Sequence, residues 1–170
     1  MVKQKYLSHS AMIAFITLMN IYPPLSTDMY LPALPEIGKY FSANEFLVGL
    51  TLTIFFLMFA VSMILFGPLS DKYGRKPILI LGTLIYTIAS LMCVLSPNIY
   101  FLIVGRFFQG FGSGAVITIS TTLIKDCFKG KVMTKILVIT QALGVIGPMA
   151  APLIGGFLLR FRIGTGHFIY

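Results

Sequence analysis

The sequence predicts an all-α protein that crosses a membrane several times, and three observations lead to this fold class. Hydrophobic residues make up 57% of the 170 residues, and the mean hydropathy is +0.92. Charged residues make up 11%, whereas a soluble domain carries about 25%. The apolar residues also form long runs, and a helix needs about 20 of them to cross a hydrocarbon core of about 30 Å. These values disfavour a soluble fold.

Five apolar segments meet this length requirement, and the breaks between them contain charged residues, Pro, Gly or Asn, as loops do. The first segment follows Lys3 and Lys5 as a secretory signal would, but no small-residue cleavage site closes a short apolar region. We therefore expect a bundle over residues 11–159, preceded by residues 1–10 and followed by a short tail, residues 160–170. The expected spans are 11–33, 46–68, 78–95, 99–124 and 136–159.

Lysine and arginine are distributed unequally between the two sides of this bundle. Nine lie in residues 1–10 and in the second and fourth loops, three lie on the alternate side, and Arg106 lies inside a span. By the positive-inside rule, residues 1–10 are cytoplasmic and residues 160–170 are extracytoplasmic. The net charge of +8 does not indicate nucleic-acid binding, because the basic residues do not gather on one polar face. Membrane lipid is the expected surrounding.

Two ionisable residues, Asp28 and Arg106, lie inside the expected spans. Each would cost about 2.5 to 3.5 kcal/mol at a helix centre. At 1.5 Å per residue, Asp28 lies about 7 to 8 Å from the outer end of its span and Arg106 about 10 Å. We hypothesise that both face one polar cavity, in which a carboxylate can exchange protons. The alternative is that Asp28 is hydrated near the outer surface and that Arg106 only braces a neighbouring helix.

Helical spacing places several polar and small residues of the fourth span on one face. Arg106, Gln109, Gly110 and Ser113 follow the spacing i, i+3, i+4, i+7, and we expect this face to point inward. Gly110 and Gly114 are four residues apart, which predicts close approach of another helix. A nucleotide-binding loop is a poor alternative, because no strand precedes these glycines.

Prolines interrupt the first span at positions 23 and 24. Proline removes a backbone donor and clashes with the preceding turn, so these residues predict a kink or a short unwound segment. Transporters place such interruptions at midplane binding sites. Prolines also occur in membrane helices for structural reasons alone, and that alternative stays open.

The residues that carry most enzyme chemistry are scattered. His9 and His167 are far from any acidic or Cys cluster, and Cys93 and Cys127 have no metal-ligand spacing. No loop combines a nucleophile with its base. We therefore expect no catalytic residue, no metal site and no cofactor, and a membrane-bound enzyme has little support.

Four segments resemble the major facilitator superfamily. Residues 67–77, GPLSDKYGRKP, resemble its signature loop G-x-L-a-D-r-x-G-r-k between the second and third spans. Residues 102–112 match the fourth-helix motif of the proton-coupled members, with Arg106 and Gln109 at its polar positions. Residues 147–156, GPMAAPLIGG, resemble the fifth-helix antiporter motif. The segment PPLSTDMYLPALP, residues 23–35, is similar to the first helix of the Bcr/CflA subfamily of bicyclomycin and chloramphenicol exporters.

This resemblance implies a multi-pass drug antiporter of the bacterial inner membrane, with protons and small lipophilic drugs or antibiotics as its transported substrates. It implies alternating access, in which a cavity between two halves opens to one side at a time. The implied proton and substrate coupling residues are Asp28, Arg106 and Gln109. The implied cytoplasmic gate residues are Gly67, Asp71, Gly74, Arg75 and Lys76. The implied fifth-helix antiporter residues are Gly147, Ala151, Pro152, Gly155 and Gly156, with Ala151 where a glycine is usual.

The number of spans departs from this family, whose members have twelve helices in two six-helix halves. We expect an incomplete N-terminal half with five helices, produced by a frameshift or early stop near Arg160. A functional form would then need the missing C-terminal half as its partner. The alternative is a non-transporting membrane fragment that only inserts or associates with other membrane proteins.

Overall fold

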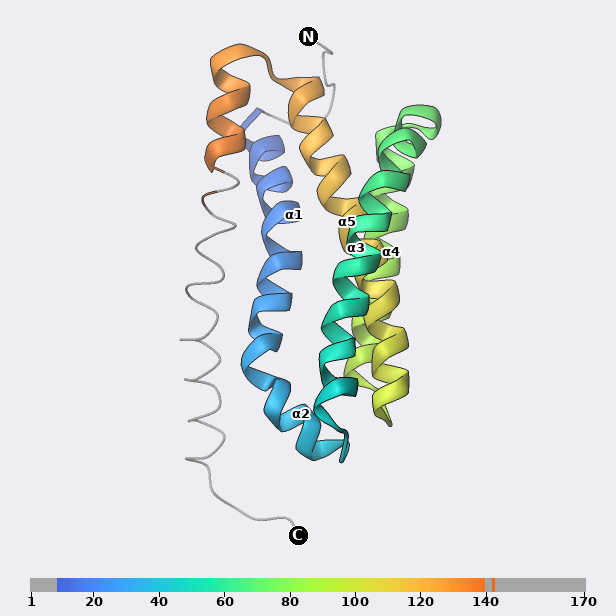
Figure 1. Ribbon diagram of the computed structural model, residues 1–170. Coiled ribbons are helices and arrows are strands. Elements are labelled where there is room, and N and C mark those ends of the chain that lie inside the picture. The colour runs from blue at the N-terminus through green and yellow to red at the C-terminus, as the bar shows by residue number, and fades with distance from the viewer. Residues whose placement is uncertain (1–8, 140–141, 143–170) are drawn as a thin grey trace.

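The computed structural model describes residues 9–139 and 142, and every regular element within them is a helix. The helices α3, α4 and α5 are long and apolar enough to cross a membrane. The prediction of an all-α membrane protein is therefore confirmed. In chain order the elements are α1 (His9–Tyr30), the 3-10 helix η1 (Leu31–Ala33), α2 (Leu34–Tyr40), α3 (Glu45–Tyr73), α4 (Arg75–Val94), α5 (Ile99–Cys127) and a helical segment over residues 130–139 (Figure 1).

Helix α5 is the centre of the bundle and packs against α3, α4 and α1. In the most apolar stretch of 18 residues in each helix, 61% of the residues are buried in α5, compared with 22% in α3 and 28% in α4. The start of α1, the junction between α3 and α4, and the end of α5 lie at the same end of the bundle (Figure 1). We call this the basic end, because it carries Lys72, Arg75, Lys76, Lys125, Lys129, Lys131 and Lys135.

The opposite end of the bundle holds α2 and the connection between α4 and α5 (Figure 1). Two asparagines start helices there, and each accepts a hydrogen bond from a backbone N–H that has no partner inside the helix. Asn44 Oδ1 accepts from the Leu47 N–H at 2.9 Å at the start of α3. Asn98 Oδ1 accepts from the Phe101 N–H at 2.8 Å at the start of α5. These caps fix where the two helices begin.

Glycines on α5 let its two neighbours approach closely. A Cβ atom at Gly110 would overlap the α3 backbone, and one at Gly114 would lie 2.5 Å from the Phe59 carbonyl oxygen of α3. A Cβ atom at Gly112 would lie 2.6 Å from the Tyr86 nitrogen of α4. The predicted close approach at Gly110 and Gly114 is confirmed, and Gly112 provides a second contact of the same kind on the other side of the helix.

The signature segment is helical rather than a loop, which corrects the sequence-based expectation. Helix α3 continues through Pro68 to Tyr73, and α4 begins at Arg75. Gly74 alone separates them, with φ at +92°, a backbone conformation that other residues rarely adopt. The chain therefore reverses direction within one residue, and this glycine is required by its backbone geometry.

Helix α1 is continuous across Pro23 and Pro24, so of the two predicted outcomes, a kink or a short unwound segment, the unwound segment is not present there. Two side chains of this helix donate to its own carbonyls. Asn20 Nδ2 donates to the Ile16 carbonyl at 2.9 Å, and Thr27 Oγ1 donates to the Pro23 carbonyl at 3.1 Å. The carbonyls that the prolines leave without an N–H donor are those of Met19 and Asn20, four residues earlier, so these two bonds do not replace the missing ones. The helix narrows to a 3-10 turn only at η1, which contains Pro32.

Two apolar clusters hold the helices together near the basic end. The first joins α3, α4 and α5 through Phe66, Ile78, Leu79, Ala115, Val116 and Ile119. The second joins α1, α5 and the segment 130–139 through Ile16, Ile124, Phe128 and Ile136. The segment 130–139 is therefore packed on the bundle by buried apolar contacts.

Candidate functional site

Arg106 lies in the interior of the bundle, with only 5% of its surface exposed. Its Nη1 donates to Gln109 Oε1 at 2.9 Å, one turn along α5. Gln109 Nε2 donates to Ser90 Oγ of α4 at 3.0 Å. The guanidinium also lies over the Tyr30 ring of α1, 3.4 Å from its centroid, which is the geometry of a cation–π contact. Arg106 thus connects three helices.

Tyr30 extends this network to a fourth helix. Its hydroxyl is hydrogen-bonded to Thr51 Oγ1 of α3 at 2.8 Å. Thr51 is fully buried and donates to the Val48 carbonyl at 2.6 Å. The four long helices α1, α3, α4 and α5 therefore converge on one connected set of polar side chains. The predicted inward face of α5 is confirmed, since Arg106, Gln109, Gly110 and Ser113 are all buried.

Arg106 has no ion-pair partner among residues 9–139 and 142. Both salt bridges in that part of the chain belong to Arg75, and Arg106 Nε has no hydrogen-bond partner there. Arg106 also borders a cavity of about 370 Å³ near the opposite end of the bundle. The residues around this cavity are Tyr30, Ile37, Tyr40, Phe41, Cys93, Val94, Ser96, Leu102 and Arg106.

Asp28 lines a second cavity, of about 130 Å³, between α1, α3 and α5. Its Oδ2 atom is buried without a hydrogen-bond partner in the described part of the chain, and so is Ser113 Oγ of α5. A volume of this size can hold a few water molecules, each of which takes about 30 Å³ in the liquid. The walls consist of Pro23, Pro24, Thr27, Asp28, Phe55, Phe56, Phe59, Ser113 and Ile117.

The expectation that Asp28 and Arg106 share one cavity is not met in this structure, because each lines a cavity that the other does not. The reason lies in α1. Asp28 and Tyr30 are two residues apart, which is a rotation of about 200° around a helix. When the Tyr30 ring covers the guanidinium, the Asp28 carboxylate points to another side of the helix. Tyr30 therefore takes the place next to Arg106 that was expected for the acid.

The signature residues form a cluster of charges at the basic end. Arg75 Nη1 lies 2.6 Å from Asp71 Oδ1 and donates to Ser70 Oγ at 2.5 Å. Arg75 Nε donates to Asp126 Oδ2 at 3.0 Å, which links the start of α4 to the end of α5. The structure thus places Asp71 and Arg75 together.

Two signature residues make no comparable contact within the described part of the chain. Lys76 is exposed, and a Cβ atom at Gly67 would meet nothing within 4 Å. Sequence reasoning missed Asp126. Its only signal is that it is the one acid in an otherwise basic stretch that also holds Lys125, Lys129, Lys131 and Lys135.

Tyr30, Thr51 and Ser90 were also missed, since single hydroxyl groups in apolar spans are common and carry no pattern. The implied fifth-helix residues Gly147, Ala151, Pro152, Gly155 and Gly156 lie outside the described residues. Within residues 9–139 and 142, no group of three or more His, Cys, Asp and Glu side chains is placed to hold a metal ion. The arrangement places a fixed positive charge and a carboxylate beside separate cavities within an apolar bundle.

A family model described as Major Facilitator Superfamily matches residues 12–166. An uncharacterized MFS-type transporter, YdgK, from Bacillus subtilis is 36% identical over 160 residues, covering 94% of this chain and 40% of the relative. A bicyclomycin resistance protein homolog from Haemophilus influenzae is 32% identical over 154 residues, covering 89% and 39%. The multidrug resistance protein MdtL from Klebsiella pneumoniae is 29% identical over 148 residues, covering 87% and 38%. The chain spans about two fifths of the length of these curated relatives.

Proposed function

Because this chain belongs to the Major Facilitator Superfamily, we propose that it is part of a proton-coupled exporter of small lipophilic drugs, of the Bcr/CflA type. The names of two relatives, a bicyclomycin resistance protein homolog and a multidrug resistance protein, support drugs as the substrate class. The similarity of residues 23–35 to the first helix of that subfamily supports the same assignment. Transport is the activity that the name of the Bacillus relative describes.

The observation that carries this proposal is the position of Asp28. One of its carboxylate oxygens is buried without a partner among the described residues, in a cavity with aromatic walls between three helices. Burial of a charged carboxylate without a partner is unfavourable, so this group is suited to take up a proton and release it again. Loading a proton changes the charge of this cavity, while Arg106, which borders the other cavity, stays positive. We assign Asp28 to proton coupling, and Arg106 with Gln109 to the coupling of proton and substrate.

We further propose that the chain lies in the bacterial inner membrane with its N-terminus in the cytoplasm. The concentration of Lys and Arg at the basic end supports this orientation. The cavity beside Arg106 then opens toward the outside, and the cluster of Asp71, Arg75 and Asp126 lies on the cytoplasmic side. In that position Gly67, Asp71, Gly74, Arg75 and Lys76 are assigned to a cytoplasmic gate.

The test is a chimera in which this chain replaces the matching part of the full-length Haemophilus relative. The chimera is expected to lower the accumulation of a lipophilic drug in energised cells, and Asp28→Asn is expected to abolish that export. Glu36→Gln is the matched control, because it removes an exposed acid of α2 and should leave export intact. Insertion is checked by the amount of each variant in the membrane fraction. Unchanged export in Asp28→Asn would remove Asp28 from the mechanism.

The second candidate is a membrane fragment that does not transport by itself, and the chain spans about two fifths of the length of each of these relatives. Alternating access needs two halves that close against each other. Cells that express only these 170 residues distinguish the two functions. Drug resistance above that of cells with an empty vector supports export by the chain itself. Resistance equal to that of the empty vector, with the chain present in the membrane, supports the fragment.

A further inference from the structure

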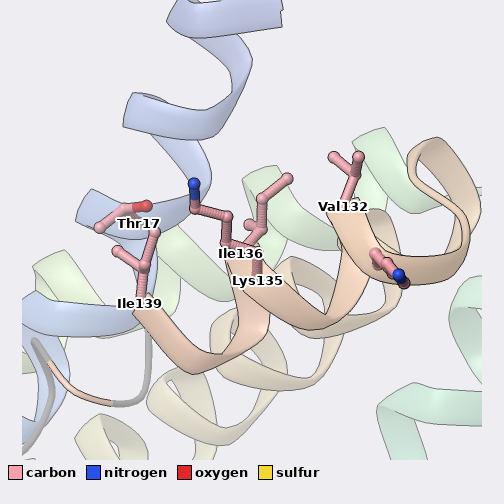
Figure 2. Close-up of a pocket in the computed structure, with 6 residues that line it drawn as sticks. Thr17, Val132, Lys135, Ile136 and Ile139 are labelled. Atoms are coloured by element: carbon pink, nitrogen blue, oxygen red, sulfur yellow. The ribbon is translucent and has the colours of Figure 1, made fainter.

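A groove at the basic end lies between α1 and the helical segment 130–139, away from both cavities described above. Its volume is about 450 Å³. Thr17 of α1 faces Lys135, Ile136 and Ile139 of the segment, and the Lys135 side chain extends toward Thr17 (Figure 2). Among the described residues, the groove is lined by Thr17, Lys131, Val132, Lys135, Ile136 and Ile139.

The spacing of these residues produces two adjacent rows on one helix face. Lys131 and Lys135 are four residues apart, so their Cα atoms are about 6 Å apart along the axis. Val132, Ile136 and Ile139 form the row beside them. Ile136 is buried against the bundle, whereas Val132 is 56% exposed and Ile139 is 45% exposed. The groove therefore combines a pair of ammonium groups with an open apolar wall.

The positive charge of this groove has no acidic side chain to neutralise it. The chain contains five Asp and Glu residues. Asp71 and Asp126 are bound to Arg75, and Asp28 lines its own cavity. Glu36 and Glu45 belong to α2 and to the start of α3, at the opposite end of the bundle. Neither Lys131 nor Lys135 is therefore paired with an acidic side chain, and both stay available to an anion from outside the chain.

We propose that this groove binds one anionic phospholipid. Its phosphate lies between Lys131 and Lys135, with the Thr17 hydroxyl as a further hydrogen-bond donor, and an acyl chain lies along Val132, Ile136 and Ile139. Basic pockets between membrane helices bind anionic headgroups in this way, and lysine stems lie along apolar surface while their ammonium groups reach the headgroup layer. The site requires that the chain is in a membrane, but it does not require that the chain transports anything.

The test uses the full 170-residue chain in neutral detergent, titrated with phosphatidylglycerol that carries a fluorescent acyl tail. Saturable binding is expected, with phosphatidylcholine bearing the same tail bound at least tenfold more weakly. A basic side chain near an anionic lipid surface contributes a free energy that corresponds to about fivefold in affinity, so Lys131→Gln/Lys135→Gln should bind about 30-fold more weakly. Lys131→Arg/Lys135→Arg keeps both charges and should retain binding within about threefold.

Lys129→Gln is the matched control, because it removes an exposed lysine of the same stretch that does not line the groove. It should change the affinity by less than about twofold, since an exposed charge that does not line the groove interacts with the phosphate through solvent and is screened by salt. Helicity by circular dichroism and elution as a single species verify that each variant is folded. Ile139→Ser should weaken binding of the diacyl lipid, and glycerol phosphate, which lacks acyl chains, should not displace it at equal concentration.

Four outcomes would overturn the proposal. These are equal affinity for phosphatidylcholine, an equal loss in Lys129→Gln and in the double glutamine variant, displacement by glycerol phosphate at equal concentration, and the absence of saturable binding. Displacement by glycerol phosphate would identify a site for a free phosphate anion instead of a lipid. None of these measurements depends on drug export, so this proposal and the proposed function can fail separately.

Discussion

Two arginines show how differently a charged residue can be stabilised in this chain. Arg75 lies at the basic end and binds two carboxylates and a hydroxyl. Arg106 is buried in the bundle, where an aromatic ring and a glutamine oxygen are its partners. A cation over an aromatic face gains more when it is desolvated, so Tyr30 compensates for part of the missing counter-charge. The second arrangement leaves a net positive charge inside the protein.

Substitution of Tyr30 tests this contribution. Tyr30→Phe keeps the ring over Arg106 but loses the hydrogen bond to Thr51, and should lower the free energy of unfolding by about 1 kcal/mol. Tyr30→Leu also removes the aromatic face and should cost about 2 kcal/mol more. Unfolding is induced with dodecyl sulfate in mixed micelles with a neutral detergent, and circular dichroism monitors the loss of helix. Equal losses in the two variants would show that the ring does not stabilise Arg106.

The contact between Arg75 and Asp126 allows a direct measurement of coupling. A double-mutant cycle of Arg75→Gln and Asp126→Asn should give a coupling energy of about 0.5 to 1 kcal/mol, because both groups are partly exposed. The control cycle combines Arg75→Gln with Glu36→Gln at the opposite end, and its effects should add. High salt should reduce the first coupling, since it screens exposed charges. Additive effects in the first cycle would contradict the contact.

At the scale of the element, the packing of α5 depends on its glycines, which have no side chain. Gly110 and Gly114 face α3, and Gly112 faces α4, so two backbones approach it from different sides. Close backbone packing of this kind is a main source of attraction between helices in a bilayer. An apolar side chain gains no hydrophobic free energy there, because the lipid tails that it leaves are as apolar as the protein interior. At the basic end Gly74 has a different task, which is the single-residue reversal between α3 and α4.

Gly112→Ala is expected to destabilise the bundle. The added Cβ atom would lie 2.6 Å from the Tyr86 nitrogen and 2.8 Å from the Gly82 oxygen, and backbone atoms cannot rotate away. Overpacking of this kind costs about 1 to 3 kcal/mol. Gly49→Ala in α3 is the matched control, because no described residue lies within 4 Å of its Cβ position. It should leave stability unchanged or raise it slightly, since alanine favours the helix. Equal effects in the same micellar unfolding measurement would contradict the packing.

At the scale of the whole molecule, the bundle has two chemically different ends. The basic end carries the Arg75 cluster and the lysines of the segment 130–139, and the opposite end carries α2 and the cavity beside Arg106. The asymmetry is what a chain with a single orientation in a membrane requires, because cytoplasmic segments are rich in Lys and Arg.

The two native cysteines test this orientation. Cys93 borders the cavity near the opposite end, and Cys127 ends α5 at the basic end. In spheroplasts, a maleimide that cannot cross membranes should label the Cys127→Ser variant, whose remaining cysteine is Cys93. The Cys93→Ser variant should be labelled only after the membrane is permeabilised. The reverse pattern would invert the proposed orientation. As a control for thiol reactivity, each variant is also labelled after complete solubilisation.

The sequence by itself determined the membrane class and the helical fold, because composition and the length of apolar runs do not depend on packing. It also determined the close approach at Gly110 and Gly114 and the inward face of α5, because helical spacing places those residues on fixed sides of one element. The residues of the signature segment were also found, but their helical conformation was not, since proline and charge normally mark a loop.

Only the tertiary structure decided which polar groups meet. The side of α1 that faces α5 is set by packing, and this places Tyr30 rather than Asp28 against Arg106. Asp126 joins Arg75 across 51 positions of sequence, and no local pattern encodes such a distance. The groove between α1 and the segment 130–139 arises in the same way, from two stretches that become neighbours only when the helices pack. Local periodicity fixes the faces of each helix, whereas the rotation of each helix in the bundle is a property of all of them together.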